Sequence, residues 1–473
     1  MTELPKGWEW VCLADITEIN PKLPFENIPD VLEVTFLPMK HVEERSNKIS
    51  LVETRKYGDV KKGFVPMTDG DVIFAKISPC MENGKVAIVH SLRNHIAFGS
   101  TEFHVFRMKG MVIGKFVFHY LNREDFRRNA QGMMTGAVGQ RRVPRKFLEE
   151  SSIPLPPLAE QERIVARIEE LFSSLDKGIE SLKTAQAQLK TYRQAVLKWA
   201  FEGRFTNADV PEGELPAGWK WVKLGDLTKS IEAGKSFKCD ERPPSERETG
   251  VLKVSAVTWG VFDENESKTV TDPEKINSNY LVRIGDFLFS RANTLDLIGA
   301  VVRVHALTKK LLLSDKTLRL SFHTQIVNED WVLHFLRCQI GRKQIQDNSS
   351  GNQESMRNIG QEGIRRISIP LPPTLDEQAR VVAEIEARLS VCDQVEAGIT
   401  RGLEQAEALR QSILKRAFEG KLVPQDPADE PASALLARIR AAADSSAAAG
   451  RAGKDASKAS SGRKRAKVKR DGK

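Results

Sequence analysis

Basic and amide side chains recur at matching places in the two halves of this 473-residue chain. Arginine can donate two hydrogen bonds to a guanine edge, asparagine or glutamine can pair with adenine, and lysine or arginine neutralises phosphates. Taken singly, each residue is better explained as a solvated surface charge; the signal lies in their recurrence on equivalent loops. The residues predicted to contact nucleic acid are Lys76, Asn83, Lys85, Gln140, Arg141 and Arg142 in the first half, and Lys235, Arg291, Asn293, Gln353, Arg357 and Asn358 in the second.

Catalytic motifs are missing from the sequence. Gly234, Lys235 and Ser236 resemble the end of a phosphate-binding loop, but Lys229 stands where that motif needs glycine. There is no Asn-Pro-Pro-aromatic motif, no glycine-rich cofactor loop after a strand, and no cysteine or histidine at metal-ligand spacing. The sequence therefore predicts a chain without a catalytic residue, metal or cofactor of its own.

Two long stretches that must position these loops are near-copies of one another. Glu160–Gly203 and Glu377–Gly420 align without a gap and share 18 identities in 44 positions. Each follows an Ile-Pro-Leu-Pro-Pro segment, which cannot be helical, and each ends in a glycine placed as a C-terminal cap. Thr374 and Glu377 stand at capping-box spacing. Each copy predicts one long helix.

Apolar residues follow a seven-residue period in both copies, which is the pattern of a coiled coil. Small residues such as Gly178 and Gly402 would let two backbones approach closely, whereas Arg388 does not fit the seam. The alternative is an ordinary buried helix of a bundle. The residues predicted to pair the helices are Leu171, Leu175, Leu182, Leu189, Ile399, Leu409 and Ile413.

The segments in front of the two helices also repeat. They open with ELPKGWEWVCLADI at Glu3 and ELPAGWKWVKLGDL at Glu214. Each then has a Gly-Asp-led strand, at Gly70 and Gly285, followed by a second strand, a helix-like stretch and a polar loop. Each segment predicts a strand-rich, mixed α/β globule.

The net charge of +9 belongs to the end of the chain. Residues 451–473 hold ten Lys or Arg against two Asp, which leaves 62 basic and 61 acidic residues elsewhere. The tail predicts non-specific attraction to phosphates or a merely solvated end. The start has no signal-peptide pattern and no run is long enough to span a membrane, so we expect a cytoplasmic protein with reduced cysteines.

The Ile-Pro-Leu-Pro-Pro…Glu-Gln openings, the Ala-Phe-Glu-Gly ends and the Leu-Pro-x-Gly-Trp openings together resemble the DNA-specificity subunit of type I restriction–modification systems. The match covers about residues 3–425. This resemblance implies an α+β fold in which two mixed α/β target recognition domains are separated by two long helices that pair as an antiparallel coiled coil, with pseudo-two-fold symmetry. The implied domains are 1–152 (target recognition domain 1), 153–204 (spacer helix 1), 205–368 (target recognition domain 2 with its linker), 369–425 (spacer helix 2) and 426–473 (a short helix and a disordered basic tail).

The resemblance also implies a function without catalysis. Each domain would read one half of a bipartite, asymmetric sequence in double-stranded DNA. Two modification subunits carrying S-adenosylmethionine would methylate adenine, and restriction subunits using ATP and magnesium would cleave. The chain would bind no cofactor itself.

Two other functions stay open at this point. One is an assembly scaffold that holds two protein-binding globules on a coiled-coil spacer, which the nearly neutral body permits. The other is an enzyme in its own right, which would methylate DNA unaided. Affinity for DNA that falls with salt favours the DNA reader over the scaffold.

Overall fold

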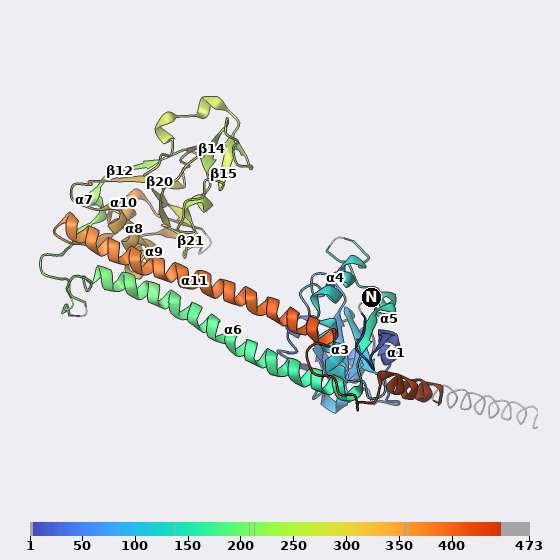
Figure 1. Ribbon diagram of the computed structural model, residues 1–473. Helices are drawn as coiled ribbons and strands as arrows, with labels where there is room; N and C mark the ends of the chain where they lie inside the picture. The colour runs from blue at the N-terminus through green and yellow to red at the C-terminus, as the bar shows by residue number, and fades with distance from the viewer. Residues whose placement is uncertain (1–2, 138, 208, 212, 354–355, 446–473) are drawn as a thin grey trace, which may run out of the picture. The chain divides into compact units, whose positions relative to one another are not determined.

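The computed structural model describes residues 3–137, 139–207, 209–211, 213–353 and 356–445. It divides into two compact units (Figure 1): the first holds residues 1–180 and 403–473, and the second holds residues 181–402. The predicted basic tail lies outside the described residues. None of the described helices is long and apolar enough to cross a membrane.

The first unit is built on two four-stranded sheets, with strand orders β2-β9-β6-β7 and β4-β3-β8-β5. Most neighbouring strands are antiparallel, but β3 and β8 run parallel. Its strands are β1 (Glu9–Cys12), β2 (Thr17–Ile19), β3 (Glu33–Leu37), β4 (Glu53–Lys56), β5 (Val65–Thr68), β6 (Val72–Ala75), β7 (Val86–Ile88), β8 (Ile96–Gly99), β9 (Phe103–Met108) and β10 (Ser152–Leu155). Its helices are α1 (Leu13–Ile16), η1 (Met39–His41), α2 (Tyr57–Val60), η2 (Arg93–His95), α3 (Gly114–Leu121), α4 (Glu124–Gly132) and α5 (Arg145–Glu150), and a further helix covers 432–445.

The second unit repeats this plan. Its sheets have the orders β12-β20-β16-β18 and β13-β15-β14-β19, and β14 and β19 are the parallel pair. Its strands are β11 (Lys220–Lys223), β12 (Thr228–Ala233), β13 (Cys239–Asp240), β14 (Thr249–Leu252), β15 (Ser267–Val270), β16 (Phe287–Ser290), β17 (Ala292–Asn293), β18 (Val301–Arg303), β19 (Lys310–Leu312), β20 (Thr317–Phe322), β21 (Ser350–Gln353), β22 (Met356–Asn358) and β23 (Ser368–Leu371). Its helices are α7 (Leu224–Leu227), η3 (Val254–Val257), η4 (Pro273–Lys275), η5 (Ser278–Tyr280), α8 (Glu329–Arg337), α9 (Gln339–Asp347) and α10 (Gln361–Arg365).

The Gly-Asp-led stretches form strands β6 and β16, and each is an inner strand of its sheet. Each helix-like stretch is two helices rather than one, because the chain turns at Arg123 and at Cys338, whose backbones are extended. The polar loops predicted to lead into Ile-Pro-Leu-Pro-Pro each contain a short helix, α5 and α10, that the sequence reading missed.

The Ile-Pro-Leu-Pro-Pro segments are edge strands, in agreement with the exclusion of helix there. β10 pairs antiparallel with β1, and β23 pairs antiparallel with β11. Proline lacks an N–H, so an outer strand of a two-stranded sheet tolerates it. These strands bind the start of each globule to the start of the long helix that follows it.

The two long helices are α6 (Leu158–Phe201) and α11 (Leu375–Phe418), and each contributes to both units. Both end as predicted, with Gly203 and Gly420 in the left-handed region at φ +76° and +68°. The N–H groups of Arg204 and Lys421 then donate to carbonyls five residues back, which satisfies the last turn. The capping box at Thr374 is only half formed: its hydroxyl accepts the Glu377 N–H at 3.3 Å, while the Glu377 carboxylate bonds elsewhere.

The helices pair in opposite directions. In the second unit Leu182 lies against Gly402, and Arg193 bonds Asp393 and Glu396 at 2.7 and 2.8 Å. In the first unit, the Arg410 guanidinium lies over the Phe172 ring at 4.8 Å. Gly402 lies close to the partner helix, since a Cβ there would be 3.1 Å from the Leu182 side chain, whereas a Cβ at Gly178 would meet no described atom within 4 Å.

One of the two heptad positions of α11 is buried, and the other is mixed, since Gly402 lies against Leu182 while Leu409 is exposed. Ile385, Cys392, Ile399 and Ile413 are buried at seven- or fourteen-residue intervals, whereas Leu409 is 48 % exposed, because its neighbour Arg410 faces α6 instead. Arg388, the misfit, bonds Glu384 at 2.5 Å and lies over the Phe205 ring at 4.8 Å. Among the predicted pairing residues, Ile399 and Ile413 are buried, and Leu171, Leu175, Leu182 and Leu189 are half-buried.

The Leu-Pro-x-Gly-Trp motif explains why the opening of each globule repeats. In the first unit the Trp8 indole N–H donates to Glu160, in the first turn of α6, at 2.9 Å. In the second unit Trp219 donates in the same way to Glu377 of α11 at 3.0 Å. The glutamines that follow these acids bond the Ile-Pro-Leu-Pro-Pro carbonyls and the backbone N–H that precedes α3 or α8.

The proline of the same motif reaches the far end of the other long helix. A Cβ built on Gly420 would lie 2.3 Å from Pro5, and one on Gly203 would lie 2.1 Å from Pro216. Each motif therefore joins the opening of one long helix to the closing end of the other, and these glycines leave the space that the contact requires.

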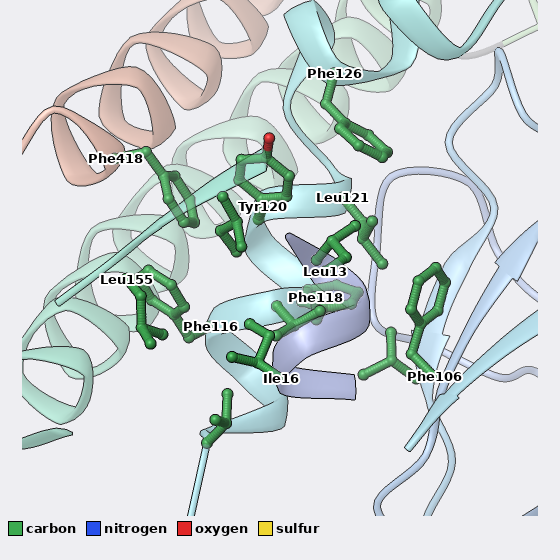
Figure 2. Close-up of a cluster of buried hydrophobic side chains, with 14 of the residues drawn as sticks. Leu13, Ile16, Phe106, Phe116, Phe118, Tyr120, Leu121, Phe126, Leu155 and Phe418 are labelled. Carbon is green, nitrogen blue, oxygen red and sulfur yellow. The ribbon is translucent and has the colours of Figure 1, made fainter. Parts of the chain in front are cut away.

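The phenylalanine of each Ala-Phe-Glu-Gly end enters a globule core. Figure 2 shows Phe418 of α11 beside Phe116 and Tyr120 of α3, with ring centroids 4.8 and 5.3 Å away. In the second unit, Phe201 of α6 packs against Trp331 at 4.8 Å. The core of each globule thus includes the closing turn of a long helix.

We predict that Gly420→Ala destabilises the first unit by more than backbone strain alone. An alanine at positive φ costs about 1–2 kcal/mol, and its methyl group would also overlap Pro5. The matched control is Gly63→Ala, because Gly63 has φ +81° and a Cβ there would meet no described atom within 4 Å. Urea unfolding of the two variants measures the difference, and equal losses would contradict the contact with Pro5.

Two buried histidines predict acid sensitivity. Burial lowers the pKa of His119 to about 3 and that of His334, at the matching place in α8, to about 4. A depressed histidine pKa contributes stability above its unfolded pKa that is lost as pH falls. We expect His119 to remove about 2 kcal/mol from the first unit between pH 7.5 and 5.

His119→Leu should therefore flatten the fall in the unfolding free energy of the first unit over that range, and His334→Leu should do so in the second unit. Urea titrations at several pH values measure both slopes. Profiles that stay parallel to that of the unchanged protein would rule out this origin of acid sensitivity.

Candidate nucleic-acid interface

The residues that follow β6 and β16 lie in the same backbone setting. The Lys76 N–H donates to the Glu102 carbonyl at 2.9 Å, and the Lys76 carbonyl accepts from Val143 at 2.9 Å. Arg291 makes the same two bonds, to Lys316 at 3.0 Å and from Ile359 at 2.9 Å. Each basic residue is thus held between the segment that precedes β9 or β20 and the loop that leads into Ile-Pro-Leu-Pro-Pro.

The loops before Ile-Pro-Leu-Pro-Pro lie beside these basic residues in both units. In the first unit the backbone of Arg142 forms isolated antiparallel β-bridges with Ile77 and Thr135, and the Ser78 N–H donates to the Arg141 carbonyl. In the second unit β17 pairs with β22, which sets Asn293 opposite Arg357 and Ala292 opposite Asn358. The structure therefore brings together Lys76 with Gln140, Arg141 and Arg142, and Arg291 with Asn293, Arg357 and Asn358.

Several predicted contact side chains are already bonded within the protein. The Arg142 guanidinium makes two bonds of 2.9 Å to Glu102, and this pairing lowers the pKa of Glu102. Arg357 donates to backbone carbonyls of Ser349 and Gly351, at 3.0 and 2.8 Å, within its own hairpin. These guanidiniums act first to shape their loops.

Asn83 and Lys85 lie on the turn between β6 and β7 and bond the segment that follows β3. Asn83 donates to Glu44 at 2.8 Å, and Lys85 donates to the Met39 carbonyl at 3.3 Å. Gln140, Gln353 and Asn358 are exposed. Asn83 and Lys85 therefore belong to a neighbouring turn rather than to the loop of Gln140–Arg142.

Lys235 is exposed at the end of β12. Its neighbour Gly234 crosses Leu313 so closely that a Cβ would lie 1.9 Å from that carbonyl oxygen, and no helix follows in residues 235–238. This geometry explains the Gly234 motif as a tight backbone crossing and not as a phosphate loop. The Gly234 N–H donates to the Ser314 carbonyl at 3.2 Å, two residues before Lys316, whose carbonyl accepts from Arg291.

Glu102 is a site residue that the sequence reading missed. It occupies the place that Lys316 takes in the second unit, so one unit has an acid where the other has a base. The antiparallel pairing of β6 with β9 would have revealed it, since Ala75 lies opposite Phe103. Among the described residues, no group of three or more His, Cys, Asp and Glu side chains is arranged to hold a metal ion.

A family model described as "Type I restriction modification DNA specificity domain" matches the chain twice, over residues 5–190 and 216–405. The chain belongs to this family. It is similar to the EcoEI specificity subunit of Escherichia coli, with 30% identity over 87% of this chain and 83% of the relative. It is also similar to the EcoAI specificity subunit of Escherichia coli, with 26% identity over 83% of this chain and 79% of the relative.

Two solved structures share the fold. A chain from a study described as the structural basis of complex assembly and conformational transition of the type I R-M system has a TM-score of 0.70 at 22% identity, covering 89% of this chain and 100% of that one. The HsdS subunit from Thermoanaerobacter tengcongensis has a TM-score of 0.54 at 22% identity, over 89% and 98%. The resemblance and the predicted fold class are confirmed, and as a specificity subunit the chain is not an enzyme.

We predict that Glu102→Ala steepens the salt dependence of DNA binding. The substitution frees the Arg142 guanidinium, and each added phosphate contact changes the slope of log K against log salt by about 1. The matched control is Glu44→Ala, which removes the same charge but frees only the Asn83 amide. Fluorescence anisotropy at several salt concentrations measures both slopes, and identical changes would reduce the effect to net charge.

Proposed function

We propose that this specificity subunit reads a bipartite, asymmetric sequence in double-stranded DNA, one half with each unit. The proposal rests on a repeated backbone arrangement, here called the cradle: Lys76 bonds Glu102 and Val143, and Arg291 bonds Lys316 and Ile359 in the same way. The backbone bonds of the two cradles match, while their side chains differ. A constant frame with different donors and acceptors suits two readers of different base sequences.

The side chains offered in each cradle differ in kind. The first unit presents Lys76, Gln140, Arg141 and an Arg142 held by Glu102. The second presents Arg291, Lys316 and Asn358, and an Asn293 held by Thr258 and Thr294, with no described acid in the place of Glu102. Amide groups pair with adenine and guanidiniums with guanine, so the two units should prefer different half-sites.

The remaining parts of the proposal concern partners. The paired long helices serve as the spacer between half-sites, because two readers on a stiff connector gain affinity through effective concentration. Two modification subunits carry S-adenosylmethionine and methylate adenine in the bound target. Restriction subunits carry ATP and magnesium and act from the same complex in the cytoplasm. The proposed domain boundaries are those given by the resemblance.

We expect substitutions in the two cradles to act on separate half-sites. In the assembled complex, Gln140→Ala with Arg141→Ala should relax recognition of one half, and Arg291→Ala with Asn358→Ala should relax the other. Each lost bidentate contact is worth about 1–3 kcal/mol of discrimination. Sequencing of methylated adenines in cells that carry each variant measures the change base by base.

The control is the unchanged half in each variant, which should keep its sequence preference. An equal loss of sequence preference at both half-sites would contradict the proposal that each unit reads one half. A DNA affinity that does not respond to salt would favour the protein-binding scaffold instead.

A further inference from the structure

A turn between η3 and β15 exposes two large apolar side chains. Trp259 is 74 % exposed and Val261 is 77 % exposed, on either side of Gly260, which has φ +82°. An exposed tryptophan beside a second exposed apolar residue forms a small apolar tip. Such a tip costs free energy in water, and exposed apolar groups of this kind mark contact surfaces.

The backbone of this turn is held firmly. The Arg337 guanidinium donates to the Gly260 carbonyl at 2.6 Å and to the Val301 carbonyl of β18 at 2.9 Å. The Thr258 hydroxyl donates to the Val254 carbonyl at 2.8 Å, which closes the turn onto η3. Trp259 therefore projects from a fixed support and not from a loose loop.

The turn is bonded to the candidate interface of the second unit. The Asn293 side-chain amide donates to the Thr258 hydroxyl at 3.2 Å. Asn293 belongs to β17, opposite Arg357 of β22 and two residues after Arg291. Trp259, the first residue of the apolar tip, directly follows Thr258, and the Thr258 side chain is bonded to Asn293 of the candidate interface.

Two guanidiniums lie beside the tip, while Asp263, Glu264 and Glu266 follow it in the chain. A hollow of about 220 Å³ beside it is lined by Thr258, Gly260, Arg337 and Arg342, and Asp296 is the acidic residue among its described lining. Arg342 donates to the Asp296 carbonyl at 2.9 Å, and Arg337 donates to carbonyls as well. Guanidiniums that bond neutral carbonyls keep their positive charge to attract phosphate.

The geometry points to Trp259, supported by Val261, as a wedge that packs against the bases of DNA bound at the β17–β22 edge. This inference rests on the proposed function and deepens it. An aromatic face stacks on any base, and apolar wedges part base steps while neighbouring arginines hold the phosphates. An apolar tip with two guanidiniums beside it, bonded through Thr258 to Asn293, matches both needs.

The first unit carries charged residues, rather than Trp and Val, at the place that corresponds to the tip. In the first unit the segment that follows η1 carries Glu43, Glu44 and Arg45 in the corresponding place, and Glu44 is bonded to Asn83. The two half-sites should therefore differ in distortion as well as in sequence.

The test compares Trp259→Ala, Trp259→Phe and Val261→Ala in the assembled complex. The probe is a duplex carrying the genomic target identified by its methylated adenines. Loss of one base–aromatic stack lowers affinity by roughly 5- to 150-fold, so we expect Trp259→Ala to weaken binding in that range and Trp259→Phe to keep most of it. The matched control is Ile284→Ala, since Ile284 is 65 % exposed and precedes β16, at the end away from Arg291.

A second readout follows base stacking directly. 2-Aminopurine placed in turn at each position of the half-site read by the second unit should brighten on binding the unchanged complex, and that rise should vanish with Trp259→Ala. Unchanged affinity and fluorescence in Trp259→Ala would overturn the wedge. Failure of that variant to assemble with its partner subunits would also overturn it, since the tip would then be a protein contact.

Arg291→Ala separates the two levels of the argument. If it weakens binding while Trp259→Ala does not, the wedge is wrong and the proposed function stands. If neither variant alters DNA binding, the assignment of this edge to DNA fails as well.

Discussion

A tryptophan-to-glutamate hydrogen bond and a proline-to-glycine contact, each made twice, join the opening of one long helix to the closing end of the other. Trp8 and Pro5 do this in the first unit, and Trp219 and Pro216 do it in the second. The contacts join segments that are up to about 400 residues apart in the chain. Neither helix can slide along the other without breaking them, so the register of the pair is fixed at its ends.

These contacts at the helix ends matter because the interface between the two long helices is partly apolar and partly charged. One heptad position of α11 is apolar and buried, but the other includes Arg388, which lies over Phe205, and its residue Leu409 is exposed while the next residue, Arg410, lies over Phe172. Cation–π contacts and ion pairs of this kind are worth less than a buried leucine pair. The seam alone would define register weakly, and the aromatic cores around Phe418 and Phe201 supply the rest.

The globules add variety to this constant frame. The strand order, the parallel pair and the backbone bonds around Lys76 and Arg291 repeat in the two units. The side chain at one equivalent position differs, because the first unit has Glu102 where the second has Lys316. A change of charge at one backbone position alters which loop arginine is free, and that alters what the unit can bind. Specificity can then change without disturbing the fold, because the reading side chains lie on loops outside the shared core.

The sequence by itself determined the order of the parts. Its duplication, its prolines and its capping glycines predicted two long helices, two strand-rich globules and the strand and cap positions, because these signals act over a few residues. The roles of Glu160 and Glu377 could not be read in this way: the capping spacing at Thr374 suggested a local use, while the carboxylate bonds Trp219 from a distant segment.

The candidate site was predicted in part. Lys76, Arg291 and the loops before Ile-Pro-Leu-Pro-Pro came from the repeat, but only the tertiary structure showed that Arg142 is held by Glu102 and that Arg357 bonds its own hairpin. It alone also set Trp259 next to Asn293 and turned Leu409 outward. The physical reason is the same in each case: periodicity and composition report the local conformation, whereas which charge meets which partner depends on strands and helices that are brought together only by folding.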